Sequence, residues 1–222
     1  MMKCWYSGNC HLENESCKDN CIRYKNIQTL LVNSNLPTTL WNINPIIVDS
    51  IDMQAFKAVA QIGKNISKFV KEGKCLYLWS TNTGNGKTTW ASRLMLAYFN
   101  EIWVYSQLKC RGIYIYIPNL INSLKTQYLT GFSNSELLDN IKNANLVIFD
   151  DLGCGKLSDN DINNLLDLID YRLNNNKSCI FTSNLSKQEL SNLLGKRLTS
   201  RIYNSSLVLE LRGVDKRGVC ND

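Results

Sequence analysis

The fold of this chain is decided by residues 75–89, whose sequence is CLYLWSTNTGNGKTT. The apolar run 75–79 predicts a buried strand, a helical pattern begins at Thr88, and a loop rich in Gly, Thr and Asn lies between them. The loop matches the pattern G-x-x-x-x-G-K-[ST], except that Thr81 stands where the first Gly is expected. We therefore expect a strand, a phosphate-binding loop and a helix, in that order.

The residue types in this loop suit a polyphosphate such as that of ATP. Gly84 and Gly86 let the backbone curl tightly enough to point several N–H groups inward, and the helix that opens at Thr88 adds a favourable dipole. The Lys87 ammonium can reach the β- and γ-phosphates, and the Thr88 hydroxyl can bind Mg²⁺. A Gly-rich turn with a chance lysine is the alternative. We expect the nucleotide to be bound by Thr83, Gly84, Asn85, Gly86, Lys87, Thr88 and Thr89.

Apolar strands alternate with helical patterns along the chain. Each strand is a continuous apolar run, which is typical of a parallel sheet covered by helices on both faces, in an α/β fold. Tyr114 and Tyr116 fall in such a strand, so we expect both in the core. Ligands of these sheets bind at the carboxyl ends of the strands. We expect strands at 75–79, 113–117, 145–149, 179–182 and 207–211, and helices at 52–71, 88–100, 119–129, 134–143, 159–174, 187–193 and 196–203.

Two carboxylates follow one of these strands. Asp150 and Asp151 end the apolar run 146–149. Asp150 is placed to hold Mg²⁺ opposite Thr88, and Asp151 to polarise an attacking water as a general base. The alternative is a solvated turn, but a phosphate loop at a compatible spacing upstream favours the functional interpretation.

Another strand ends in the polar run Thr-Ser-Asn at 182–184. We expect its tip to lie beside the strand that carries Asp150, where Asn184 could position water or contact the γ-phosphate. Capping of the following helix by Asn184 or Ser186 is the alternative, since both are good capping residues.

Basic residues are more ambiguous. Arg197 and Arg201 are four residues apart and share one helix face, from which an arginine could reach a neighbouring subunit's γ-phosphate. The alternative for both is a solvated basic face. Lys109, Arg111 and Lys125 flank the second strand and its helix, and they are candidates for contacts with nucleic acid or for ordinary surface charges.

The motifs together resemble a known family. Residues 80–89, DDLG at 150–153, TSNLS at 182–186 and the R-x-x-x-R at 197–201 follow one another in order. This set resembles the AAA+ ATPases of the bacterial and phage helicase-loader group (the DnaC/DnaI type), to which the transposition ATPase IstB is related. The likeness covers roughly residues 50–217. It implies a P-loop NTPase with an AAA+ core.

The resemblance also implies roles and two departures. Asp151 stands where many AAA+ proteins have Glu, although Asp-Asp is common in the loader and IstB group. The sequence ends soon after the last expected strand, so we expect no C-terminal lid domain. The implied roles are Walker A for Lys87 and Thr88, Walker B for Asp150 and Asp151, sensor 1 for Asn184, arginine finger for Arg201 with Arg197 as its companion, and phosphate sensor for Arg217.

Four cysteines are clustered near the N-terminus. Cys4, Cys10, Cys17 and Cys21 lie in a short polar stretch, with His11 beside the second of them. Zinc takes four thiolate or imidazole ligands, and it would supply the folding energy that such a segment lacks. We expect these four cysteines to bind Zn²⁺, with His11 as a possible replacement for one of them. Free thiols are the alternative.

The composition and charge of the chain indicate its class of protein, its location and its domain organisation. The 222 residues carry 25 Lys and Arg against 19 Asp and Glu, a net charge of +6, which permits a nucleic-acid partner. No apolar run is long enough for a membrane span, and the N-terminus lacks the apolar core of a signal peptide. We expect a cytoplasmic protein with a cysteine-rich module at 1–22, a linker at 23–50 broken by Pro37 and Pro45, and an ATPase domain at 51–222.

The resemblance implies ATP-dependent loading of a hexameric replicative helicase onto single-stranded DNA, by a protein that assembles into an ATP-dependent homo-oligomer. An IstB-like transposase helper is the nearest alternative. A small kinase that acts on a nucleotide or a metabolite is a third alternative, but such an enzyme would not need arginines that act in a neighbouring subunit. A non-enzymatic adaptor, in which the nucleotide only gates binding, is a fourth.

Overall fold

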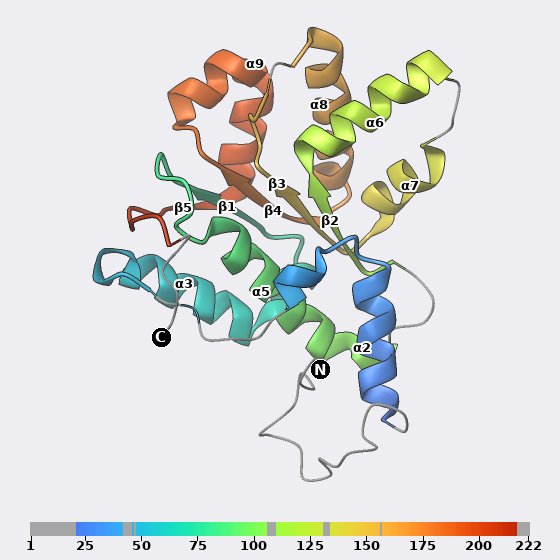
Figure 1. The fold of residues 1–222 in the computed structure, drawn as a ribbon, viewed down its shortest axis with the longest axis vertical. Coiled ribbons are helices and arrows are strands. Elements are labelled where there is room, and N and C mark those ends of the chain that lie inside the picture. Colours follow the sequence, from blue (N-terminus) through green and yellow to red (C-terminus); the bar gives the residue numbers. More distant parts are fainter. Residues whose placement is uncertain are drawn as a thin grey trace.

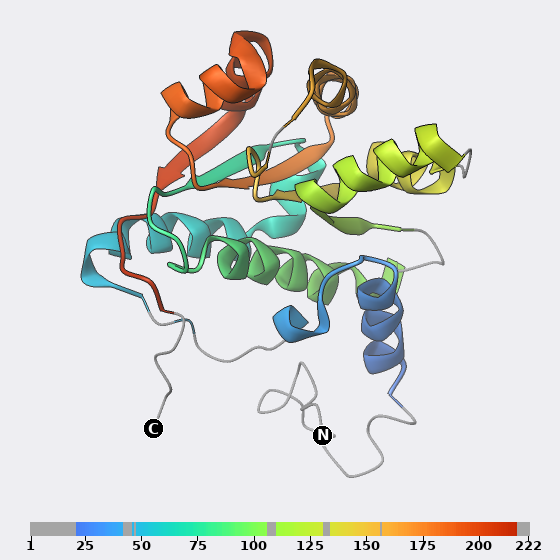
Figure 2. The same cartoon turned by 45° about the horizontal axis from the view of Figure 1, so that its top comes forward.

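In the computed structural model, five parallel strands form one sheet in the order β2-β3-β4-β1-β5, between two layers of helices (Figures 1 and 2). The strands are β1 Cys75–Trp79, β2 Gly112–Tyr116, β3 Leu146–Asp150, β4 Ser178–Ser183 and β5 Ser206–Glu210. The structure describes residues 21–41, 46, 48–105, 110–130, 134–155 and 157–216, with the side chains of 127–130 left aside.

The two faces of the sheet bury alternate residues of each strand, as the pleat requires. Leu76 and Leu78 of β1 face one helical layer, whereas Tyr77 between them faces the other. Every residue of β3 and β4 is buried, which explains why these strands read as continuous apolar runs. Figure 2 shows the two layers edge-on, with α2, α3 and α5 below the sheet and α6, α8 and α9 above it.

The helices match the predicted ones closely. One layer contains α2 Ile22–Val32, α3 Met53–Lys64, α4 Ile66–Lys71 and α5 Lys87–Ile102, together with the short 3₁₀ turns Thr38–Trp41, Ser50–Asp52 and Trp103–Tyr105. The other layer contains α6 Ile117–Thr130, α7 Ser135–Asn143, α8 Asp159–Asn174 and α9 Lys187–Ser205.

Two helical regions are interrupted by a residue with non-helical backbone angles. The helix expected over 52–71 is divided at Asn65, whose φ of −127° and ψ of 31° are not helical. The two short helices expected near the C-terminus are confirmed, because α9 is interrupted at Gly195 with φ 80° and ψ 155°. Among the helices of the described residues, none is long and apolar enough to cross a membrane.

The stretch expected as a linker contains a helix that belongs to the core. Ile27, Leu30 and Leu31 of α2 are buried in the same apolar cluster as α5. The Arg23 guanidinium donates to Asn100 Oδ1 at 2.7 Å and thereby fastens α2 to the end of α5. The sequence signal was weak because the apolar residues of α2 are mixed with Lys, Arg and Asn around the helix, which leaves little amphipathic pattern.

Candidate functional site

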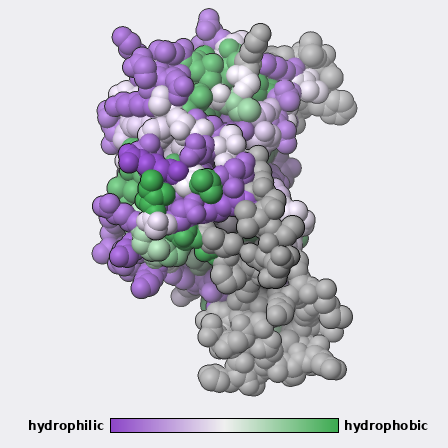
Figure 3. All heavy atoms as spheres, turned by 60° about the vertical axis from the view of Figure 1, so that its left-hand side comes forward, coloured by the Kyte–Doolittle hydropathy of each residue, from purple (hydrophilic) through white to green (hydrophobic). Residues whose placement is uncertain are grey.

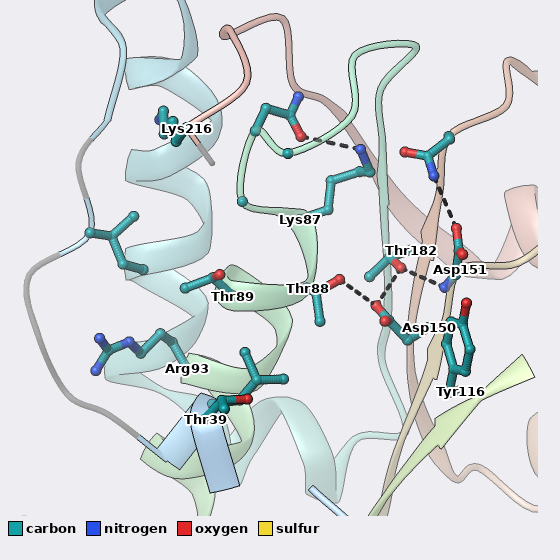
Figure 4. Close-up of a pocket in the computed structure, with 16 residues that line it drawn as sticks. Thr39, Lys87, Thr88, Thr89, Arg93, Tyr116, Asp150, Asp151, Thr182 and Lys216 are labelled. Atoms are coloured by element: carbon teal, nitrogen blue, oxygen red, sulfur yellow. Dashed lines mark hydrogen bonds between the residues drawn. The ribbon is translucent and has the colours of Figure 1, made fainter. Parts of the chain in front are cut away.

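A cavity of about 710 Å³ opens at the carboxyl ends of the strands, beside the loop that follows β1 (Figure 4). Its position is the one at which parallel sheets bind their ligands. The cavity collects most of the residues that the sequence analysis singled out, although Thr83 lies outside it. Its walls are formed by Thr39, Leu40, Ile46, Gly84, Asn85, Gly86, Lys87, Thr88, Thr89, Arg93, Tyr116, Asp150, Asp151, Thr182, Asn184 and Lys216.

The loop has the backbone that a phosphate site requires. Gly84 and Gly86 have φ angles of 67° and 99°, a region that side chains other than Gly rarely adopt. Lys87 opens α5, and its ammonium donates to Asn82 O at 2.9 Å and to Asn85 Oδ1 at 3.1 Å. Both acceptors are loop oxygens, which phosphate oxygens could replace without moving the lysine out of the cavity.

Asp150, at the end of β3, is surrounded by hydroxyl groups. Its Oδ1 accepts from Thr88 Oγ1 at 2.8 Å and from Thr182 Oγ1 at 2.7 Å, and its Oδ2 accepts from Tyr114 Oη at 2.7 Å. The pKa of Tyr114 is raised mainly by burial and secondly by the negative charge of Asp150. The Tyr114 hydroxyl therefore keeps its proton and remains a hydrogen-bond donor. A carboxylate beside a threonine hydroxyl is a set of hard oxygen donors, and it fits Mg²⁺.

Asp151 is held in a left-handed conformation, with φ 61°. Its backbone N–H donates to Thr182 Oγ1 at 2.9 Å, and its Oδ1 accepts from Asn184 Nδ2 at 3.0 Å. Strands β3 and β4 are paired, as predicted, and this pairing brings the two motifs together. The cap of α9 is Ser186, in a capping box with Glu189, so Asn184 is not needed for that purpose.

Several residues of the cavity wall were not predicted as site residues, among them Arg93 and Tyr116. Arg93 lies one helical turn after Thr89 on the same face of α5, and Figure 4 shows it at the far end of the cavity from Tyr116. Helical spacing was a usable signal for Arg93. Tyr116 was predicted to be in the core, which is wrong: it is 36% exposed, because it is the last residue of β2 and extends beyond the covering helices.

Part of the cavity wall is formed by residues from the N-terminal side of the chain. Thr39, Leu40 and Ile46 border the cavity, and Figure 4 shows Thr39 beside Arg93. They lie in the stretch expected to be a linker, and nothing in their sequence pattern pointed to a binding role. Their contribution depends on the tertiary path of the chain, which places the turn Thr38–Trp41 against α5.

The segment after β5 returns across the phosphate loop. The backbone N–H of Lys216 donates to Gly84 O at 3.0 Å, and Asn82 Nδ2 donates to Gly213 O at 3.2 Å. The Asp52 carboxylate accepts from the backbone N–H groups of Arg212 at 2.7 Å and of Gly213 at 3.0 Å, which fixes the segment on its other side. Arg217, the expected phosphate sensor, lies outside the described residues.

The two predicted arginines of α9 lie away from this cavity. Arg201 Nε is 3.3 Å from Asp170 Oδ1, and Arg197 Nη2 is 3.8 Å from Asp170 Oδ2. Asp170 belongs to α8 and is largely buried, whereas both arginines keep much of their surface exposed. Both arginines therefore lie at the surface of the chain and outside the cavity wall.

The remaining candidates are mostly unplaced. Lys109 and three of the four expected zinc ligands, with His11, lie outside the described residues, and Cys21 directly precedes α2. Among the described residues, no three His, Cys, Asp or Glu side chains are grouped to hold a metal. Lys125 pairs with Asp161 at 3.1 Å, and Arg111 donates to Tyr105 O at 3.2 Å.

Comparison with known proteins bears on this geometry. Residues 64–205 match the family described as IstB-like ATP binding protein. No curated protein matches the chain in sequence. Among solved structures, the DnaC helicase loader is 24% identical, with a TM-score of 0.66 over 79% of this chain and 100% of that chain.

Two further structures share the fold. DnaI is 23% identical, with a TM-score of 0.62 over 81% of this chain and 96% of that chain. The replication initiator DnaA, bound to AMPPCP and single-stranded DNA, is 18% identical, with a TM-score of 0.60 over 75% of this chain and 48% of that chain. At such identities the likeness establishes a common architecture.

Proposed function

The chain belongs to the family of IstB-like ATP-binding proteins, of the AAA+ type, and from this premise we propose that it is an ATPase that loads a hexameric replicative helicase onto single-stranded DNA. One observation carries the nucleotide part of the proposal: Lys87, Thr88 and Asp150 converge on one cavity beside the glycine loop. The shared architecture with a helicase loader supports the rest.

Each side chain of the cavity has a role in this proposal. Lys87 neutralises the β- and γ-phosphates, while Thr88 and Asp150 hold Mg²⁺, which when bound offsets the negative charge that develops on the phosphates. Asp151 is the general base for the attacking water, and Asn184, which donates to the Asp151 carboxylate at 3.0 Å, fixes the direction in which that carboxylate points.

We assign Arg201 and Arg197 to the nucleotide site of a neighbouring subunit. Both guanidinium groups are partly exposed and are anchored on one side by Asp170. Figure 3 brings forward the left-hand side of Figure 1, onto which the loop after β1 faces. The surface of this side is mostly hydrophilic with separate hydrophobic patches. Such a surface suits a contact between subunits that forms when ATP is bound and dissociates after hydrolysis.

The N-terminal module remains a proposal of its own. We assign Cys4, Cys10, Cys17 and Cys21 to one Zn²⁺, with His11 as the replacement ligand, and the module to helicase docking in the cytoplasm. Metal analysis of the freshly purified full chain tests the zinc. A protein that holds no zinc would overturn this assignment and leave the ATPase assignment intact.

The loading role is tested by size-exclusion co-elution with the hexameric replicative helicase of the same source. The full chain is run with ATP, with ADP and as the Asp151→Asn variant, and we expect a complex that depends on the nucleotide and on residues 1–21. Asp167→Asn, an exposed carboxylate of α8, is the matched control. Absence of a complex in every nucleotide state would overturn the loader and favour a transposase helper.

The assignment of Arg201 is tested by mixing two inactive variants. Arg201→Ala keeps an intact nucleotide site, and Asp151→Asn keeps an intact arginine. If the arginine acts on the neighbouring subunit, the mixture regains ATP turnover at interfaces that combine the two intact halves. A mixture as inactive as its parts, with ATP binding preserved, would contradict the assignment.

A further inference from the structure

Two buried cysteines face each other at the amino ends of neighbouring strands. β1 and β4 are paired with Leu76 opposite Ile180, so Cys75 and Cys179 are the preceding pair on the same face. Both side chains are buried in the same apolar cluster. Neighbouring strands are about 4.7–4.9 Å apart, which lies within the range of about 4.4–6.8 Å between the Cα atoms of a disulfide.

A buried arginine lies directly beside this pair. Arg172 of α8 is fully buried, and its Nε is 3.3 Å from Cys179 Sγ. Its other contacts are main-chain oxygens: Nη1 donates to Ile141 O at 2.6 Å and Ala144 O at 2.8 Å, and Nη2 to Ser178 O at 2.5 Å. A buried cation normally has an anionic partner, and no carboxylate of the described residues forms an ion pair with Arg172.

The thiol next to Arg172 is suited to supply that negative charge. Burial opposes ionisation of Cys179, but the hydrogen bond from Cys75 and the charge of Arg172 outweigh it, and together they place the pKa of Cys179 below its ordinary value. The same contact raises the pKa of Cys75, so the proton stays on Cys75. A thiolate beside a protonated thiol is the arrangement of a redox-active pair.

Small molecules have a route to the pair. Cys75 forms part of the wall of a groove of about 540 Å³ between the α3–α4 region and β5. The groove is bordered by apolar Ile62, Phe69 and Leu207 and, at its rim, by charged residues such as Lys74. The groove gives a small uncharged molecule access to Cys75, and Cys179 lies fully buried on the neighbouring strand.

We propose that Cys75 and Cys179 form a redox pair that hydrogen peroxide converts into a disulfide. The Cys179 thiolate attacks one peroxide oxygen, the O–O bond breaks, and hydroxide leaves to give a sulfenic acid. The sulfur of Cys75 then attacks the sulfenic sulfur and loses its proton, the S–O bond breaks, and water leaves. Both sulfurs are oxidised at the expense of one peroxide, and a thiol reductant reverses the change. The inference is independent of the proposed function.

Tryptic mapping of the full chain tests the pair, because each cysteine falls in its own peptide. Cleavage after Lys74 and Lys87 isolates Cys75 in residues 75–87, and cleavage after Lys177 and Lys187 isolates Cys179 in residues 178–187. After peroxide treatment and alkylation of the remaining thiols, we expect these two peptides to appear cross-linked and to separate again with a reductant. Recovery of both peptides as alkylated thiols, while the exposed Cys154 is oxidised, would overturn the proposal.

Two variants separate chemistry from simple proximity. In Cys75→Ser the cross-link is lost, and we expect a sulfenic acid at Cys179, which dimedone traps when the peroxide-treated protein is unfolded in urea. In Cys154→Ser the cross-link between 75–87 and 178–187 should form as in the natural chain. A Cys75→Ser variant that folds, as shown by circular dichroism, and yields no trapped Cys179 would contradict the assignment of Cys179 as the reacting sulfur.

Discussion

Asp150 at one end of the sheet and Arg172 at the other are both buried charged side chains, but their hydrogen-bond partners differ in kind. At the carboxyl end, Asp150 accepts from three hydroxyl groups and borders a large cavity. At the amino end, Arg172 donates to three main-chain oxygens and a thiol and is closed off from solvent. Helix α8 connects the two ends, since its first turn carries Asp161 and its last turn carries Arg172.

The partners explain the difference. A hydroxyl can rotate and exchange its hydrogen bond for a metal ligand bond, so the surroundings of Asp150 suit a group that changes its partner. Main-chain oxygens at the ends of β4 and α7 cannot turn away without unfolding local structure, so the main-chain partners of Arg172 stay fixed. The comparison predicts that Asp150 controls the turnover of ATP and that Arg172 controls the stability of the fold.

The largest effect is expected at the amino end. Arg172→Met removes the donors of three buried carbonyl oxygens, and we expect the free energy of unfolding to fall by about 3–5 kcal/mol. Urea unfolding followed by circular dichroism measures it. Arg197→Met, at an exposed arginine, is the control and should change stability little. If the free energy of unfolding fell no further in Arg172→Met than in the control, the proposed difference between the two ends of the sheet would be wrong.

The next effect is expected at the carboxyl end. Asp150→Asn keeps an oxygen that accepts from the hydroxyl groups but removes the charge that binds Mg²⁺, so turnover of ATP should fall roughly 100- to 1,000-fold. Stability should change far less than in Arg172→Met. Steady-state ATP hydrolysis and urea unfolding of the same preparation measure both, and Asp167→Asn serves as the control. A variant that loses stability and keeps turnover would reverse the assignment of the two ends.

A smaller change sharpens the role of the hydroxyl groups around Asp150. Tyr114→Phe removes one donor and leaves the ring in place, so we expect a loss of about 1 kcal/mol in stability and a fall of roughly fivefold in turnover. Tyr105→Phe, at an exposed tyrosine, should change neither. If Tyr114→Phe left turnover untouched, the hydroxyl would be a packing feature and not part of the metal site.

The smallest effect concerns the start of α8. Hydrogen bonds from Ser158 and the charge of Lys125 outweigh burial and lower the pKa of Asp161. Its stabilising contribution is therefore present above the unfolded pKa of about 3.9 and is lost as the pH falls further. Asp161→Asn should lower stability by about 1 kcal/mol at neutral pH, and the two proteins should converge below that value. Equal differences at both pH values would exclude this carboxylate as the cause.

The sequence was most informative where local pattern and chemistry coincide. The apolar runs predicted all five strands because strands buried on both faces need apolar residues at every position. Asp150, Asp151 and Asn184 were found because the ends of parallel strands meet at one edge. The phosphate loop was found because its glycines answer a backbone requirement that the sequence displays directly.

Features that depend on the tertiary path were missed. Helix α2 mixes charged and apolar residues, so its sequence does not show which face is buried. That face is defined by the packing of α2 in the same cluster as α5. Lys216 meets Gly84 only because the chain turns back after β5. Arg172 was not singled out, since nothing in the local sequence distinguishes a solvated charge from one enclosed between the end of α7 and the start of β4.

The left-handed backbone of Asp151 restricts what evolution can place there. At φ 61°, Gly, Asn and Asp are tolerated, whereas larger or branched side chains add strain of about 1–2 kcal/mol. Of the three tolerated residues, only Asp offers a carboxylate to the cavity. Asp therefore meets both requirements of position 151 in this chain, the left-handed backbone and the negative charge.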